Sequence, residues 1–139
     1  MEQFSVLLVD DEEDFLRTIL KRLAKRGINA EGANRGEQAL AMLTENPRDV
    51  VVLDVKMPGM DGIEVLKRIK TSWPTTEVIM LTGHASIDAA VEGMGCGAFD
   101  YLMKPADLED LLYKLEDAFR KKSLHERRIQ QLKQEGEAK

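Results

Sequence analysis

The chain has 139 residues, of which 43% are hydrophobic and 32% charged, and its net charge is −5. This composition predicts one soluble domain and argues against sequence-independent binding of nucleic acid, because an acidic surface repels phosphates. No apolar run approaches the roughly 20 residues that span a bilayer, and the N-terminus lacks the pattern of a secretion signal. Cys96 is the only cysteine, so no intramolecular disulfide can form, and a cytoplasmic location is expected.

Short apolar runs alternate with segments of helical period, which is the pattern of an α/β protein with a parallel sheet. We expect strands at about 5–9, 29–33, 50–54, 77–81 and 99–103. The run at 50–54 is apolar on both faces, as a central parallel strand must be. Five helices are expected to follow these strands in turn.

The expected helices are marked by apolar residues at helical spacing and by their end residues. The first follows the first strand and stops near Gly27, and the second spans about 36–43. Asp61 and Glu64 form a capping-box pattern at the start of the third helix. Ser86 is expected to cap the fourth.

Three glycines distinguish the fourth helix, at positions 93, 95 and 97. Each costs up to roughly 1 kcal/mol in a helix interior. We therefore expect this helix to be short or mobile, and unusually compliant if it belongs to a switching surface.

The last helix is expected to begin near Asp107, and its apolar face fades after Phe119. Five strands and five helices need only about 120 residues. We therefore assign residues 1–120 to one domain and 121–139 to a helical extension or linker. Heptad spacing continues only in fragments there, with Lys122 and His125 at core positions, so a stable coiled coil is not favoured.

Functional groups stand where four of the apolar runs end. Asp10 and Asp11 follow the first run, Asp54 ends the third, Thr82 follows the fourth and Lys104 follows the fifth. The C-termini of parallel strands gather at one edge of the sheet, where ligands bind. Three carboxylates at one point call for a cation, and a single lysine beside them suits a phosphoryl group.

Each of these residues also has a simpler interpretation. Asp10 and Asp11 fit the acidic first turn of a helix, and Asp54 fits a turn after a strand. Thr82 fits an ordinary β-branched strand residue, and Lys104 fits an ordinary surface lysine. Two acids at adjacent strand ends nevertheless offer the oxygen ligands that Mg²⁺ prefers. Pro105 restricts the backbone of Lys104, and Gly83 predicts a tight turn that points the Thr82 hydroxyl into the pocket.

Together these residues resemble the receiver domain of two-component response regulators. The resemblance runs from about Phe4 to Phe119 and rests on the following motifs: Asp10-Asp11, Asp54, Met57-Pro58-Gly59-Met60-Asp61-Gly62, Thr82 and Lys104-Pro105. Residues 81–86 and 97–102 look most like receivers of the NtrC type. The resemblance implies a flavodoxin-like, CheY-like doubly wound sheet with strand order 2-1-3-4-5.

The resemblance also implies a metal-dependent phosphoacceptor site. Asp54 would accept the phosphoryl group and contribute to the metal site. Asp11 would ligate Mg²⁺ directly, Asp10 mostly through water, and the backbone carbonyl of Lys56 would be the third protein ligand.

The remaining motif residues would hold and sense the phosphoryl group. Lys104 would pair with its oxygens, and Thr82 would donate its hydroxyl to it. Tyr101 would then turn inward and change the surface formed by the fourth helix, the fifth strand and the last helix. Lys56 and His84 would border the path of hydrolytic water, and neither side chain is suited to orient a water, which predicts slow to moderate self-dephosphorylation.

We therefore expect a signalling domain and not an enzyme. Its donor would be the phosphohistidine of a sensor histidine kinase or a phosphotransfer protein, and small donors such as acetyl phosphate should also serve. Its output would be a downstream protein or domain, or a homodimer, with no membrane partner and no direct nucleic-acid contact.

Two alternatives differ in class. One is a receiver-like interaction module that is never phosphorylated, against which the complete set of acids, hydroxyl and lysine argues. The other is a metal-dependent phosphatase with an Asp nucleophile. Such enzymes need a second acid two residues after the nucleophile, and Lys56 stands there instead.

Overall fold

The computed structural model describes residues 3–57, 59–83 and 87–137. Its sheet has five parallel strands in the order β2-β1-β3-β4-β5, as expected from the sequence. The strands are β1 (Ser5–Val9), β2 (Asn29–Ala33), β3 (Val50–Asp54), β4 (Glu77–Thr82) and β5 (Asp100–Met103). The first three have the expected bounds, whereas β4 ends one residue later and β5 begins one residue later than expected.

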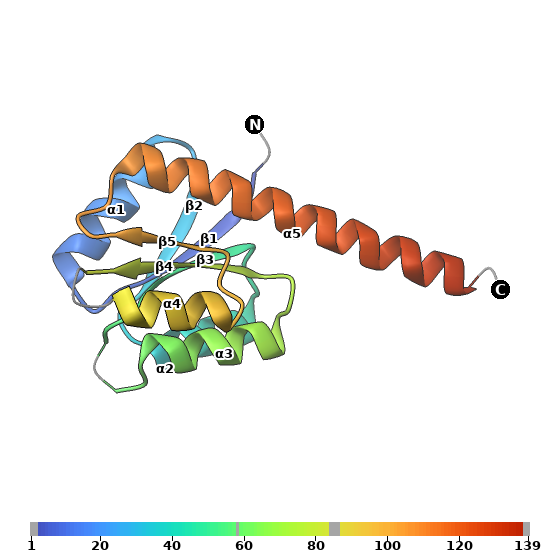
Figure 1. Cartoon of the computed structure of the whole chain (residues 1–139). Coiled ribbons are helices and arrows are strands. Elements are labelled where there is room, and N and C mark those ends of the chain that lie inside the picture. Colours follow the sequence, from blue (N-terminus) through green and yellow to red (C-terminus); the bar gives the residue numbers. More distant parts are fainter. Residues whose placement is uncertain (1–2, 58, 84–86, 138–139) are drawn as a thin grey trace.

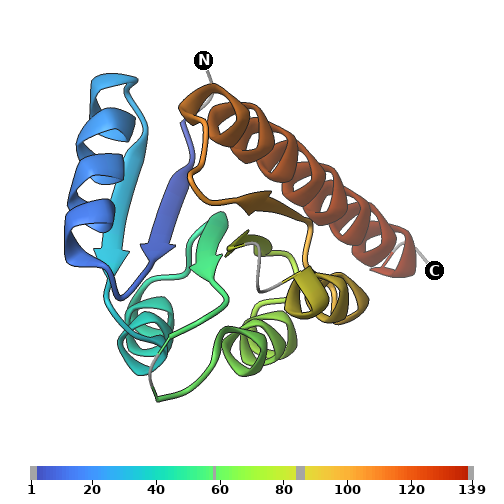
Figure 2. The same ribbon diagram turned by 60° about the vertical axis from the view of Figure 1, so that its left-hand side comes forward.

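Each strand is followed by a helix, and the five helices cover both faces of the sheet (Figures 1 and 2). They are α1 (Glu13–Lys25), α2 (Gly36–Glu45), α3 (Gly62–Ser72), α4 (Ile87–Gly95) and α5 (Leu108–Glu137). Helices α1 and α5 pack on one face, and α2, α3 and α4 pack on the other. This is the doubly wound arrangement that the alternating pattern of the sequence predicts. Among the described residues, no helix has the length and hydrophobicity needed to cross a bilayer.

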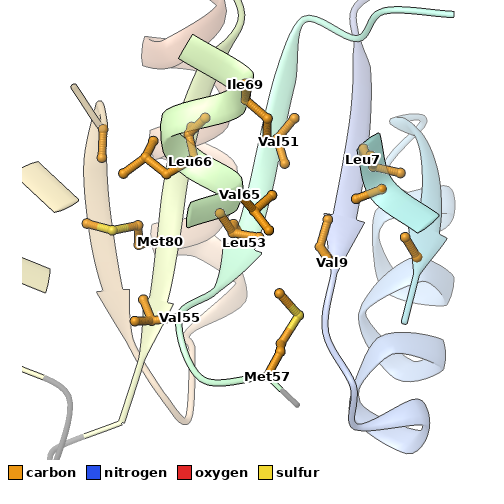
Figure 3. Close-up of a cluster of buried hydrophobic side chains, with 14 of the residues drawn as sticks. Leu7, Val9, Val51, Leu53, Val55, Met57, Val65, Leu66, Ile69 and Met80 are labelled. Carbon is orange, nitrogen blue, oxygen red and sulfur yellow. The ribbon is translucent and has the colours of Figure 1, made fainter. Parts of the chain in front are cut away.

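The central strand β3 supplies the core on both faces. Val51 and Leu53 point toward α2, α3 and α4, and Val50 and Val52 point toward α1 and α5, with all four fully buried. Figure 3 shows the first of these clusters, in which side chains of α3 fill the space over β1, β3 and β4. Burying each such side chain contributes about 1.5–3 kcal/mol. Asp54 is therefore the last residue of a strand that is tightly packed on both faces.

One of the two hydrogen bonds of the capping box expected at the start of α3 is formed. The Asp61 carboxylate accepts a hydrogen bond from the backbone N–H of Glu64 at 2.9 Å. The Glu64 carboxylate, however, pairs with Arg68 at 3.1 Å instead of turning back to the backbone N–H of Asp61 as it would in a capping box. The cap expected for α4 falls on Ser86, which lies outside the described residues.

Helix α4 is short, as expected, but Gly93 has a packing role that its sequence neighbourhood did not indicate. A Cβ atom at this position would lie 2.1 Å from Met80 Sδ on β4 and 3.3 Å from Ile63 Cδ1 on α3. The absence of a side chain therefore lets α4 approach the sheet. Its outer face is left with exposed apolar side chains, namely Ile87, Val91 and Met94.

We expect Gly93→Ala to lower the free energy of unfolding by about 1–3 kcal/mol, because the added methyl group overlaps the end of the buried Met80 side chain, which must shift within a packed core. Gly95→Ala is the matched control, since nothing lies within 4 Å of a Cβ there. That variant should match or exceed the wild type in stability. Urea unfolding followed by circular dichroism measures both, and equal stabilities of the two variants would contradict this packing role.

Helix α5 is one continuous helix of 30 residues that extends beyond the sheet on the side away from the arrowheads of β4 and β5 (Figure 1). It begins at Leu108, and the carboxylate of the preceding Asp107 accepts hydrogen bonds from the backbone N–H groups of Glu109 and Asp110. The expected boundary at residue 120 falls inside this helix. The division into a domain and an extension at that point remains a prediction.

The turns of α5 just beyond residue 120 remain attached to the base of the sheet. Lys122 Nζ lies 2.7 Å from Asp49 Oδ1, and Lys121 Nζ lies 3.2 Å from Glu77 Oε2. Thr75 donates a hydrogen bond to the Glu126 carboxylate at 3.2 Å. Because Lys122 and Asp49 are both largely buried, this ion pair is better shielded from water than a surface pair.

Two truncations should separate the attached part of α5 from the projecting part. A chain ending after Glu126 keeps these contacts and should retain wild-type stability. A chain ending after Arg120 loses them and should be less stable by about 1–2 kcal/mol. Thermal unfolding measures the difference, and two truncated chains of equal stability would show that the contacts do not hold the helix.

Candidate functional site

The parallel register brings an acid from β1 beside an acid from β3. Val9 pairs with Leu53, so the next residues, Asp10 and Asp54, lie side by side at the C-terminal edge. Asp10 is fully buried and Asp54 is 6% exposed. Lys104, which follows β5, completes the group from across the sheet. The structure thus brings together three of the residues expected at the site.

Lys104 lies among three carboxylates. Its Nζ is 2.8 Å from Asp10 Oδ2, 3.0 Å from Glu12 Oε1 and 3.6 Å from Asp54 Oδ2. It also lies over the ring of Phe15, 4.6 Å from the centroid, where the negative face of the ring attracts a cation. One ammonium group is thus shared among three carboxyl groups, and the site remains net negative.

The carboxyl group of Asp54 is held in an unfavourable environment for a charge. Burial raises its pKa from 3.8 to about 7, assisted by the negative charge of Asp10. Lys104 and the backbone N–H of Lys56, which donates to Asp54 Oδ1 at 3.2 Å, oppose this shift. The net effect is a raised pKa, so the charged carboxylate is stabilised by any ligand that adds positive charge beside Asp54.

The site favours the charged form of Lys104, whereas it disfavours the charged form of Asp54. Burial by itself would lower its pKa, but the contacts with Asp10 and Glu12 outweigh burial and raise the pKa above its ordinary value. The ammonium group therefore stays charged through the physiological range. It is available to pair with an anionic ligand.

Asp10, Glu12 and Asp54 each offer a carboxylate oxygen, and these oxygens all lie within 4.8 Å of one another. Asp10 Oδ2 is buried and, among the described residues, accepts no hydrogen bond of good geometry despite its closeness to Lys104. Hard oxygen donors of this kind fit a divalent cation such as Mg²⁺. Asp11 is exposed and lies outside this group, so its expected part in the metal site remains a prediction.

The orientation expected for Thr82 is wrong in this state. Its hydroxyl lies 3.2 Å from Met103 Sδ and 3.5 Å from the Leu102 carbonyl, so the recorded contacts go to β5 and not to the pocket. The reason is that Thr82 belongs to β4, where its side chain packs against the paired strand and is 1% exposed.

Tyr101 lies on the outside of β5 and is 43% exposed. Together with α4 it lines an apolar groove of about 410 Å³, whose residues are Ile87, Ala90, Val91, Met94, Tyr101 and Met103. The Lys56 side chain is exposed near the site, and His84 lies outside the described residues. The proposed effects of both on phosphoryl lifetime remain predictions.

The loop after β3 closes tightly on the strand that carries Asp54. Gly62 donates its backbone N–H to the Val55 carbonyl at 3.0 Å. A Cβ atom at Gly62 would lie 2.6 Å from the Asp54 carbonyl oxygen, so only glycine allows this approach. The Gly62 backbone thereby helps to fix the backbone position of Asp54.

Two residues of the site do not stand out in the sequence. Glu12 fits the acidic first turn of a helix, and Phe15 fits the inner face of α1, where it is partly buried. Glu12 in fact occupies the N-cap position without a side-chain capping bond. That position usually holds Ser, Thr, Asp or Asn, so a glutamate there was the available signal.

The strand order and the acids and lysine at the C-terminal edge of the sheet define a CheY-like receiver. The family model for the response regulator receiver domain matches residues 6–116, and the chain belongs to this family.

The chain is 39% identical to the regulatory protein AtoC of Escherichia coli over 119 residues, which are 86% of this chain and 26% of that protein. It is 39% identical to the DNA-binding transcriptional regulator NtrC of Salmonella typhimurium over 117 residues, or 84% of this chain and 25% of that protein. The chain thus spans about a quarter of the length of these curated relatives.

Solved receiver structures agree with the fold. A response regulator receiver domain protein from Clostridium thermocellum has a TM-score of 0.84 and 37% identity, with 87% of this chain and 98% of that chain covered. The receiver domain of NtrX from Brucella abortus has a TM-score of 0.79 and 32% identity, with coverage of 83% and 98%.

The raised pKa of Asp54 predicts how stability depends on pH. Because the folded-state pKa of about 7 exceeds the ordinary value of 3.8, the folded protein binds this proton more tightly than the unfolded chain. The contribution is therefore complete below about pH 4 and is lost as pH rises to about 7. Asp54→Asn should remove this loss and be more stable than the wild type at pH 8.

Urea unfolding at pH 5 and pH 8 in EDTA measures this difference. Asp14→Asn is the control, because the Asp14 side chain is fully exposed, and it should keep the wild-type pH dependence. If Asp54→Asn lost as much stability between the two pH values as the wild type, the account of Asp54 would be wrong.

Proposed function

We propose that this receiver accepts a phosphoryl group on Asp54 in a reaction that requires Mg²⁺. The donor is the phosphohistidine of a sensor histidine kinase or a phosphotransfer protein. The observation that carries the proposal is the position of Asp54 at the end of the central strand, beside Asp10 and 3.6 Å from Lys104 Nζ. Membership of the receiver family supports it.

In the proposed reaction, a carboxylate oxygen of Asp54 attacks the phosphorus in line. The new O–P bond gives an acyl phosphate, and the P–N bond to the histidine breaks, so that the imidazole leaves with the bonding electrons. A carboxylate is a weak nucleophile, and charge neutralisation around the phosphoryl oxygens makes the attack feasible. Lys104 supplies one positive charge from the protein.

We assign the cation to Asp10, Asp11, Asp54 and the carbonyl of Lys56. When bound, Mg²⁺ supplies the charge neutralisation that the net negative pocket lacks. The buried carboxylate of Asp10 and the raised pKa of Asp54 support a cation beside them. Glu12 stands among the clustered carboxylates, and Asp11 does not.

The proposed output follows from contacts that only the phosphorylated state provides. Phosphorylation adds roughly two negative charges, toward which the Thr82 hydroxyl turns from β5. The Tyr101 side chain, which is exposed in the unphosphorylated state, then moves into the space that the Thr82 side chain leaves. The apolar groove between α4 and β5 then changes shape, and this surface with α5 binds a downstream protein or domain, or a second copy of the chain.

The lifetime of the acyl phosphate is also part of the proposal. Lys56 and His84 are poorly suited to orient a water, so the acyl phosphate should hydrolyse slowly or moderately. The domain signals and catalyses no reaction on other molecules. The cytoplasmic location expected from the sequence belongs to the same proposal, as does any larger regulatory activity of the kind that the names of AtoC and NtrC describe for those proteins.

Intact-protein mass spectrometry after incubation with acetyl phosphate and Mg²⁺ tests the proposal. We expect the gain of one phosphoryl group, its loss from the reaction with EDTA, and none in Asp54→Asn. Beryllofluoride, which mimics the acyl phosphate, should bind only when Mg²⁺ is present. A folded protein that neither gains mass nor binds beryllofluoride would instead be a receiver-like module that works without phosphorylation.

A further inference from the structure

Glu12 is positioned over the site by its own backbone. Its N–H donates to Asp10 Oδ1 at 2.9 Å, which fixes the turn between β1 and α1. Its backbone is extended at the N-cap of α1, and its side chain makes no capping bond. The carboxylate instead reaches Lys104 Nζ at 3.0 Å, from a residue 92 positions away in the chain.

The three carboxylates around Lys104 differ in their freedom to move. The side chain of Asp10 is 0% exposed and that of Asp54 is 9% exposed, whereas that of Glu12 is 65% exposed. The two acids at the strand ends are therefore fixed by the sheet. Glu12 can leave Lys104 for water at little cost.

Lys104 is bound more closely to Glu12 than to the phosphoacceptor. Its Nζ lies 3.0 Å from Glu12 Oε1, which is a hydrogen-bonding distance, but 3.6 Å from Asp54 Oδ2, which is not. Phe15 limits the ammonium group on another side. In this state the ammonium group is held closer to Glu12 than to Asp54, so a group on Asp54 competes with Glu12 for the position of Nζ.

We infer that Glu12 is a positioning residue that competes with the incoming phosphoryl group for Lys104. The inference rests on the proposed phosphorylation of Asp54. Before phosphorylation, Glu12 holds the ammonium group toward the entrance of the pocket. The phosphoryl group carries more negative charge than one carboxylate, so it displaces Glu12, which swings into water.

This competition has a defined direction. Removing the Glu12 charge frees Lys104 in the unphosphorylated protein and lowers the free energy needed to reach the transition state. Glu12→Gln should therefore be phosphorylated faster. If Glu12 were instead a ligand of the cation, its removal would weaken Mg²⁺ binding and slow the reaction at limiting Mg²⁺.

The test compares the rates of phosphorylation by acetyl phosphate at saturating Mg²⁺, followed by intact-protein mass. Glu12→Gln should react about two- to fivefold faster than the wild type, as expected for the loss of an exposed ion pair. Glu13→Gln removes the same charge from the next residue, which has no recorded contact with Lys104, and should match the wild type. Glu12→Asp keeps the charge and should lie between the wild type and Glu12→Gln.

Two further measurements separate positioning from a general charge effect and from metal binding. In a Lys104→Ala background, Glu12→Gln should give no acceleration, because the residue on which Glu12 acts is gone. A Mg²⁺ titration followed by amide chemical shifts should give Glu12→Gln nearly the wild-type dissociation constant. A tenfold or greater weakening would identify Glu12 as a cation ligand and overturn the inference.

The inference also fails if Glu12→Gln is no faster than the wild type, or if Glu13→Gln accelerates the reaction equally. Those results leave the proposed function intact, because the wild type is still phosphorylated. If the wild type itself takes up no phosphoryl group from acetyl phosphate and binds no beryllofluoride, the proposed function and this inference fall together.

Discussion

The repulsion between two buried carboxylates at the end of the sheet is the constraint on which the rest of the site depends. The parallel register of β1 and β3 places Asp10 beside Asp54, and both acids are buried. Burial and this neighbour raise the pKa of Asp54 to about 7. The fold thus holds the acids in an arrangement that added positive charge stabilises.

Lys104 relieves the repulsion only in part, because one ammonium group faces three carboxylates. In the proposed function this incomplete compensation has a use, because excess negative charge attracts a cation, and the cation would allow a phosphoryl group to be accepted. The exposed Glu12 adds to the excess, and we infer that a more highly charged group displaces it.

Much of this was predictable from the sequence. The apolar runs fixed the strand positions to within one residue, since a central parallel strand such as β3 must be apolar on both faces. Asp10, Asp54 and Lys104 could be placed together because strand ends in a parallel sheet share one edge. The family resemblance added the roles, which position alone does not reveal.

Other features depend on three-dimensional contacts that periodicity does not contain. The close approach of Gly93 to Met80 is a property of how α4 packs on β4, and three glycines in the sequence indicated only a weak helix. The Thr82 hydroxyl faces β5 because of strand pairing, although the following glycine predicted the opposite. The attachment of Lys121 and Lys122 to the sheet involves residues that lie 44 or more positions earlier in the chain.

The most direct test of this account is an NMR titration of the Asp54 carboxyl carbon with and without Mg²⁺. The account predicts an apparent pKa well above the ordinary 3.8, near 7, in metal-free protein, and a large fall when Mg²⁺ is added. An apparent pKa near 4 that Mg²⁺ does not change would show that burial and the neighbouring Asp10 do not disfavour the charge on Asp54. It would contradict the central claim.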